Sequence, residues 1–180
     1  MKKTYDIKLS LLSAMHINGG VSANNKRLVV KLDGSSYVPA TLLKGIIRAN
    51  FEMLVNTFEP QNIGISASLF GSEGYNRSHV ILDNLTSEQN IPLENRAGNA
   101  VDRYTRKVLD KALVFSEVTS RFDLEGDPSA FSGEMTVYYN DETKKYEKYL
   151  VNAVKMISCV GTGKSRGLGF AEVTVNEKTC

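Results

Sequence analysis

Residues 37–58, YVPATLLKGIIRANFEMLVNTF, contain the clearest helix signal in the chain. Behind Pro39 the apolar residues recur at three- and four-residue spacing, which is the period of one helix face. Thr41 belongs to the residue types that cap helix N-termini. The pattern therefore predicts a helix that is capped by Thr41 and packs one face against a core. Its apolar face comprises Leu42, Leu43, Ile46, Ile47, Phe51, Leu54, Val55 and Phe58.

The segments around this helix alternate between strand and helix periods. Apolar residues at every second position predict strands, and spacing of three and four predicts a second helix. The predicted strands span 3–12, 79–85, 131–139 and 168–175, and the second helix spans 146–157. This order predicts an α+β, ferredoxin-like (RRM-like) βαββαβ antiparallel sheet with both helices on one face. The open face of such a sheet is a common RNA platform.

Two segments interrupt this order. Residues 13–27 form a glycine- and asparagine-rich loop, followed by a short strand-like segment that ends in a turn at Asp33-Gly34. Between residues 86 and 128 the apolar period weakens, and only 112–118, ALVFSEV, is typical of a strand. We interpret 86–128 as an inserted β-hairpin arm. Its cations are Arg96, Arg103, Arg106, Lys107, Lys111 and Arg121.

Composition limits the possible classes of protein. With 180 residues, of which 42% are hydrophobic, the chain is long enough for one well-buried domain spanning 1–180. The net charge of +2 neither requires nor excludes a nucleic acid partner. Cys159 and Cys180 provide neither a disulfide framework nor a metal cluster, so we expect free thiols, no metal and no cofactor. No apolar run is long enough for a membrane span, which predicts a soluble, cytoplasmic protein without a membrane partner.

The segment 158–170, SCVGTGKSRGLGF, carries a Gly-Lys-Ser sequence like the end of a nucleotide-binding loop. That motif needs a glycine where Ser158 stands and a helix after the loop, whereas an alternating strand pattern follows here. Small residues beside Lys164 and Arg166 suit contact with the phosphates of a longer ligand. A simple tight turn before the last strand is the alternative.

Several motifs occur together in the order typical of one family. They are LSAMHINGG, YVPATLLKGIIRANFE, LFGSE, HVILDN, VDRYTRKVLDKALVFSEV, FSGEMTV and GTGKSRGLGFAEV. Over nearly its whole length the chain resembles the RAMP superfamily of CRISPR proteins, and in particular the backbone subunits of type III effector complexes. The resemblance implies a subunit that binds guide RNA (crRNA) and its complementary target RNA. It also implies partners among other RAMP backbone subunits and effector subunits, which stack head to tail.

The resemblance also implies where RNA is bound. The arm near 95–121 corresponds to a thumb that inserts between bases of the guide–target duplex. The first loop, the polar helix face, the arm and the glycine-rich loop correspond to RNA contacts. The residues implied are His16, Asn18, Gly19, Gly20, Lys44, Arg48, Arg96, Arg103, Arg106, Gly161, Gly163, Lys164, Ser165, Arg166 and Gly167. A solvated helix face for Lys44 and Arg48, and surface ion pairs for the arm, remain alternatives.

The sequence departs from the family in the first loop. Backbone subunits that cut target RNA carry an aspartate just after the two glycines, whereas residues 21–25 are VSANN. Cleavage needs an ionisable or metal-binding group at the phosphate, so we expect RNA binding without target cleavage. The alternative is a metal-independent RAMP endoribonuclease that processes precursor crRNA, with His16 as general base or acid. A ferredoxin-like protein-interaction module that binds no RNA is a third hypothesis.

Overall fold

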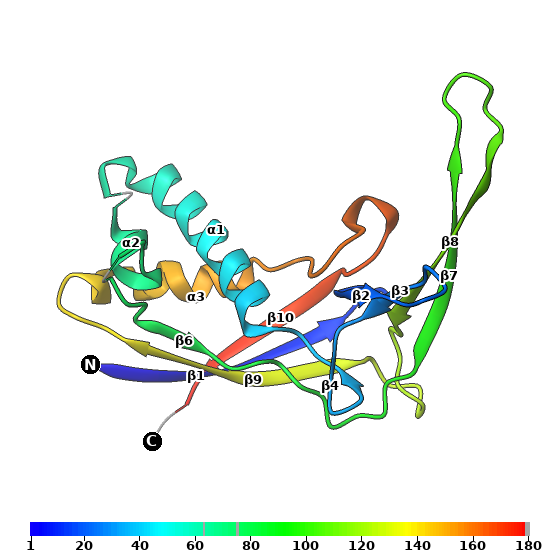
Figure 1. Cartoon of the computed structure of the whole chain (residues 1–180). Coiled ribbons are helices and arrows are strands. Elements are labelled where there is room, and N and C mark those ends of the chain that lie inside the picture. The colour runs from blue at the N-terminus through cyan, green and yellow to red at the C-terminus, as the bar shows by residue number, and fades with distance from the viewer. Residues whose placement is uncertain (63, 75, 179–180) are drawn as a thin grey trace.

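The computed structural model describes residues 1–62, 64–74 and 76–178, and its main sheet has the strand order β10-β1-β9-β6. Each neighbouring pair is antiparallel. The strands are β1 (Lys2–Leu11), β6 (Val80–Leu82), β9 (Ala130–Tyr138) and β10 (Ala171–Glu177). Helices α1 (Ala40–Phe58) and α3 (Glu147–Lys155) cover one face of this sheet (Figure 1). The α+β class is confirmed, and the arrangement is consistent with a ferredoxin-like core.

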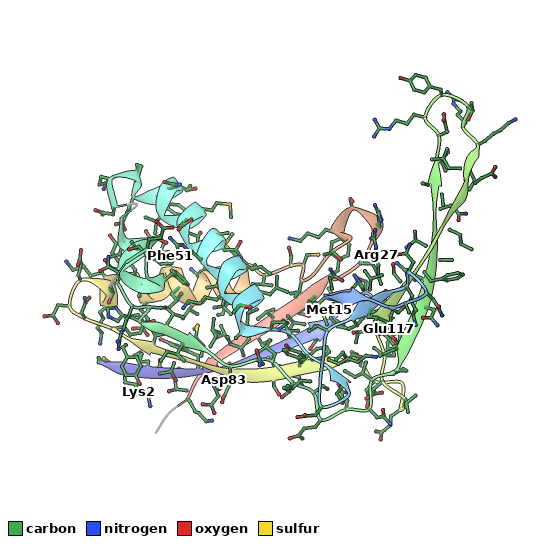
Figure 2. All side chains as sticks on the ribbon, viewed as in Figure 1. Lys2, Met15, Arg27, Phe51, Asp83 and Glu117 are labelled. Atoms are coloured by element: carbon green, nitrogen blue, oxygen red, sulfur yellow. The ribbon has the colours of Figure 1, made fainter. Side chains whose placement is uncertain are left out.

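The core lies between these helices and the sheet. On β1 the side chains alternate as a half-buried strand requires, with Tyr5, Ile7, Leu9 and Leu11 buried. On α1 every buried residue falls on the predicted face. Phe51 lies at its centre, 5.6 Å from the Phe70 ring and 6.3 Å from the Tyr146 ring between centroids (Figure 2). The buried residues of α1 are Leu43, Ile47, Phe51 and Val55.

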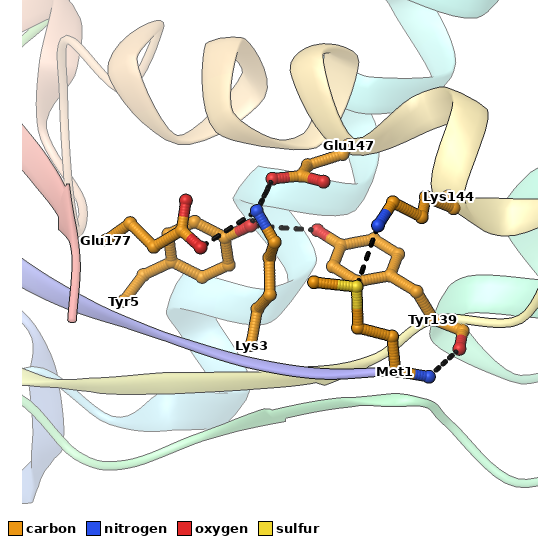
Figure 3. A network of polar contacts seen from close by, with 7 residues as sticks. All are labelled: Met1, Lys3, Tyr5, Tyr139, Lys144, Glu147 and Glu177. Carbon is orange, nitrogen blue, oxygen red and sulfur yellow. Dashed lines mark hydrogen bonds and ion pairs between the residues drawn. The ribbon is translucent and has the colours of Figure 1, made fainter. Parts of the chain in front are cut away.

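A network of hydrogen bonds and ion pairs joins the start of β1 to helix α3. The Lys3 ammonium lies 2.6 Å from Glu147 of α3 and 2.8 Å from Glu177 of β10 (Figure 3). The Tyr5 hydroxyl donates to the same Glu147 carboxylate at 3.0 Å and lies 3.4 Å from the Tyr139 hydroxyl. Strands β1 and β10, helix α3 and the residue that follows β9 therefore meet at one set of hydrogen bonds and ion pairs.

Several predicted boundaries were wrong. Thr41 does not cap α1, because the N-cap is Pro39 and Thr41 already lies in the first turn. The second core strand is only β6, because after Leu82 the regular ladder with β9 gives way to isolated backbone bonds from Asp83 and Thr86. The last strand begins at Ala171, because Leu168 and Gly169 still belong to the preceding loop, where the Leu168 amide bonds to Gly163.

The structure adds elements that the sequence pattern missed. These are helix α2 (Ile65–Phe70) and the 3₁₀ turns η1 (Pro60–Asn62), η2 (Thr143–Tyr146) and η3 (Lys164–Arg166). The predicted turn at Asp33-Gly34 is confirmed, and it joins β4 (Lys31–Leu32) to β5 (Ser35–Ser36).

A second sheet has the order β2-β3-β8-β7. Its strands are β2 (Asn18–Val21), β3 (Arg27–Val29), β7 (Leu93–Val101) and β8 (Val108–Thr119). The segment 13–27 is therefore not all loop, because β2 pairs with β3. Strands β7 and β8 form a long hairpin that projects away from the helices and the main sheet (Figure 1).

Candidate nucleic-acid interface

His16 lies where the first loop meets the base of the β7–β8 hairpin. The residue is only 5% exposed, and its Nδ1 lies 2.6 Å from the carbonyl oxygen of Glu117 on β8. Because a carbonyl only accepts, Nδ1 carries the proton and donates. In the neutral ring, Nε2 is then the unprotonated nitrogen. The imidazole thus holds the hairpin and does not project into solvent.

The glycine-rich loop, residues 161–169, rests on the backbone around His16. The Thr162 amide donates to the His16 carbonyl at 2.8 Å, and the Thr162 hydroxyl approaches the same oxygen at 3.3 Å. The Gly169 amide donates to Ala14 at 2.8 Å. His16 therefore bonds the glycine-rich loop through its carbonyl and the hairpin through its ring.

The backbone conformation of this loop and its packing on the rest of the chain favour glycine at several of its positions. Gly161, Gly163, Gly167 and Gly169 all have φ between 75° and 85°, a conformation that costs other residues free energy. A Cβ on Gly161 would overlap the His16 carbonyl oxygen. At Gly167, by contrast, the space where a Cβ would lie is open. Close packing of the loop on its own chain thus accounts for part of the glycine pattern.

The cations of the loop point away from this packing. Lys164, Ser165 and Arg166 form η3, and all three are exposed. Within the described part of the chain, neither Lys164 nor Arg166 makes an ion pair. Both charges are accordingly available to an external anion.

The first-loop residues Asn18, Gly19 and Gly20 lie in β2 and are exposed. The Asn18 side-chain oxygen accepts the Gly20 amide at 3.1 Å. A Cβ on Gly19 would come within 2.6 Å of the Val29 carbonyl oxygen, so the β2–β3 pairing requires glycine there. These residues begin two positions after His16 and stay close to the hairpin base through β3, which pairs with β8.

Glu117 is a residue that sequence reasoning missed. Its carboxylate accepts the Val29 amide at 3.2 Å and pairs with Lys31 at 3.2 Å and Lys26 at 3.5 Å. Burial alone would raise the pKa of Glu117, but the Val29 amide and the two ammonium groups hold it below its ordinary value. Glu117 thereby joins β8 to both ends of β3. A lone glutamate within ALVFSEV gave no sign of this in the sequence.

Two arginines lie on the other face of the second sheet, at the junction where the first loop meets the base of the β7–β8 hairpin. Ser116 of β8 lies opposite Arg27 of β3 in one pairing and opposite Arg96 of β7 in the other. Neighbours across a sheet share a face, so Arg27 and Arg96 stand on either side of Ser116, on the face opposite Glu117. Figure 2 labels Arg27 and Glu117 at the base of the hairpin. Arg27 was not among the predicted contacts.

Arg103 and Arg106 lie at the tip of the hairpin, far along the strands from this junction. The Asp102 carboxylate orders the tip by accepting the amides of Tyr104 at 2.7 Å and Thr105 at 2.8 Å. These backbone bonds, chiefly that of Thr105, hold the pKa of Asp102 below its ordinary value. Tyr104 is 97% exposed beside the two arginines.

Lys44 and Arg48 of α1 are engaged elsewhere. The Lys44 ammonium donates to Ser78 at 2.6 Å, and burial, with the charge of Arg48, lowers the pKa of Lys44. Arg48 bonds Glu52 at 2.8 Å and the Gly71 carbonyl at 3.3 Å. Their contacts are thus with α1 itself and with the α2–β6 connection, and the structure does not bring them to the junction at His16.

The open face of the main sheet is polar and partly ion-paired. Lys178 pairs with Asp6 at 3.5 Å and also with Glu134, and these carboxylates would repel phosphate.

Across residues 1–62, 64–74 and 76–178, no three His, Cys, Asp or Glu side chains gather as a metal site would need. None of the helices in that part of the chain combines the length and apolar character that a membrane span requires.

Comparison with known proteins gives one family and a structural likeness. The family model of the RAMP superfamily matches residues 8–172. A chain of the structure titled "Cryo-EM structure of the Type III-B Cmr-beta bound to cognate target RNA" has a TM-score of 0.72 to this one, at 9% sequence identity and over 97% of each chain. At that identity the likeness shows a shared fold. No curated protein matches the sequence.

Proposed function

Because this chain belongs to the RAMP superfamily, we propose that it is a guide-RNA-binding backbone subunit of a CRISPR type III-like effector ribonucleoprotein. The chain whose fold it shares is part of a type III-B complex bound to RNA. The partners would be crRNA, its complementary target RNA, and neighbouring backbone and effector subunits.

One observation carries the proposal. Three segments far apart in the sequence, each predicted to contact RNA, converge on His16 and Glu117: the glycine-rich loop, the β2–β3 region and the base of the hairpin. Around this junction Arg27, Arg96, Lys164 and Arg166 are exposed. Exposed cations on fixed backbone suit the phosphates of an extended RNA strand, which hold the strand without reading its sequence.

The β7–β8 hairpin is the candidate thumb. It places Tyr104, Arg103 and Arg106 at the end of two long strands, away from the body of the protein. An exposed aromatic ring can stack on a base while neighbouring arginines bind phosphates. We place the contact with the guide–target duplex at this tip.

Target cleavage is not part of the proposal. The β2–β3 turn is closed by bonds from the Ser22 amide to Lys26 and from the Asn25 amide to Ser22, and residues 21–25 contain no carboxylate. Amides and hydroxyls there cannot act as a general base at neutral pH. The rival endoribonuclease needs His16 to reach a ribose hydroxyl, and burial of its ring argues against that role.

Measuring RNA binding against salt tests the proposal. In the double variant K164A/R166A, affinity for single-stranded RNA should fall, and the slope of log K against log salt should decrease by about 1.4, or about 0.7 for each lost phosphate contact. The matched control is K145A/K148A, which removes two exposed lysines, one in η2 and one in α3. Equal losses in both variants, or no RNA binding by the unmodified protein, would contradict the proposal.

A further inference from the structure

A polar pocket lies at the end of the main sheet opposite the candidate RNA interface. It has a volume of about 430 Å³ and is lined by Ala67, Ser68, Asn76, Arg77, His79 and Asn140. Asn140 follows β9 just beyond Tyr139, whose carbonyl accepts the amino group of Met1 at 2.6 Å. The glycine-rich loop contacts residues 14–16, beyond the other end of β1. A ten-residue strand, about 33 Å long, thus separates the two sites.

The lining of this pocket is rich in hydrogen-bond donors. Arg77 is exposed and makes no ion pair with any described residue. The Asn140 side-chain oxygen already accepts the Thr143 amide at 2.7 Å and the Thr143 hydroxyl at 2.8 Å, which leaves its NH₂ group as the free part of the amide. Ser68 adds a hydroxyl from α2. None of the described residues that line the pocket carries a carboxylate.

His79 supplies an additional donor. Its Nδ1 is buried and has no hydrogen-bond partner among the described residues. A proton on a buried atom with nothing to donate to is costly, so the neutral ring keeps its proton on Nε2. Because His79 lines the pocket and its Nδ1 is buried, we take Nε2–H as the ring group that is left to face a ligand.

We propose that the pocket of Arg77, His79, Asn140 and Ser68 binds a phosphate group. The donors come from α2, from the segment before β6 and from the segment after β9, so they surround a ligand from several sides. The tetrahedral oxygens of a phosphate can accept from donors that lie in different directions, whereas the two oxygens of a carboxylate accept mainly from donors near one plane. The phosphate belongs either to RNA or to a free nucleotide, and this site is independent of the proposed function.

Histidine NMR tests the site directly, because the chain contains only two histidines and His16 serves as an internal reference. Titration of the untagged protein with inorganic phosphate should shift the ring signal of His79 saturably and leave that of His16 unchanged. Sodium chloride at equal ionic strength should leave both signals in place. In R77Q the affinity should fall at least tenfold, while K155Q, at an exposed lysine of α3, should bind phosphate like the unmodified protein. A non-saturable shift, or unchanged affinity in R77Q, overturns the proposal.

Competition identifies the source of the phosphate. Adenosine monophosphate and one short RNA, with a 5′-phosphate or a 5′-hydroxyl, are added in turn while the His79 signal is followed. Competition by the phosphorylated RNA alone would assign the phosphate to an RNA end. Competition by both RNAs would assign it to an internal phosphodiester. Competition by the mononucleotide alone would assign it to a free nucleotide. If none of the three competes, phosphate-bearing biological ligands are excluded and the proposal fails. RNA binding that depends on Lys164 and Arg166 would stand regardless of that result.

Discussion

The imidazole Nδ1 of His16 donates to the carbonyl oxygen of Glu117 at 2.6 Å, across a sequence separation of 101 residues. On the same glutamate, the carboxylate accepts the Val29 amide and pairs with Lys26 and Lys31. The two ends of one residue therefore hold the first loop and β3 against the hairpin. This junction fixes the direction in which the arm leaves the protein.

We expect E117Q to destabilise the protein in a pH-dependent way. The glutamine keeps the size of the side chain but loses the charge that Lys26 and Lys31 face, which should cost about 1.5 kcal/mol, the lower end for a hydrogen bond to a charged group. The pKa of Glu117 is lowered in the fold, so its contribution is complete above the unfolded value, about 4.3, and is lost as pH falls below it. Urea unfolding at pH 7 and pH 3 measures both effects.

The difference between E117Q and the unmodified protein should therefore shrink at pH 3. E125Q is the matched control, since Glu125 is exposed and its carboxylate makes no ion pair among the described residues. A stability loss that is the same at both pH values would show that the charge of Glu117 does not account for its contribution.

Replacing His16 separates a structural from a catalytic role. H16A leaves the Glu117 carbonyl without its donor in a buried place, which should lower the free energy of unfolding by about 1 to 3 kcal/mol. Repeat RNA should stay intact with the unmodified protein and with H16A. Site-specific cleavage that disappears in H16A would instead support the rival endoribonuclease.

The parts of the fold that could be predicted are those with a long apolar period. Strand β1, helix α1 and strand β9 were found within a few residues because each buries one face against the same core. Strand β7 could not be found, because most of its residues are exposed and its sequence, LENRAGNAV, has no buried face. It forms by pairing with β8, a long-range contact that a local pattern does not encode.

For the candidate site, the sequence showed which types of residue are present better than it showed what each residue does. The cations of the glycine-rich loop are exposed as a ligand would need, whereas His16 proved to be buried and bonded to the backbone. Glu117 was missed because its partners, Lys26 and Lys31, lie about 90 residues away in sequence. Only the folded chain shows which polar residues already have partners.

The glycines of the loop should differ in their tolerance of alanine. At Gly167 an added Cβ meets open space, so only the left-handed backbone is penalised, by about 1 kcal/mol. At Gly169 the Cβ would also collide with the carbonyl oxygen of Val160, a backbone atom that cannot move without shifting the loop. Thermal melts should therefore show a clearly larger drop for G169A than for G167A. Equal drops would mean that the backbone conformation alone requires glycine here.

Alkaline titration should reveal the network of Figure 3. Burial, more than any neighbouring charge, raises the pKa of Tyr139 to about 12, and burial with the Tyr139 contact raises that of Tyr5 further. Because the folded pKa values exceed the unfolded value of about 10, the stability from these groups is complete below pH 10 and is lost as pH rises above it.

Absorbance at 295 nm follows the ionisation of the tyrosines. Of the eight tyrosines, these two should ionise last, together with alkaline unfolding. Y5F should remove one late-titrating group and weaken the pH dependence of unfolding above pH 10, whereas Y104F, at the exposed tip, should leave that pH dependence unchanged. Early ionisation of Tyr5 and Tyr139, before any loss of structure, would show that the network is open to solvent.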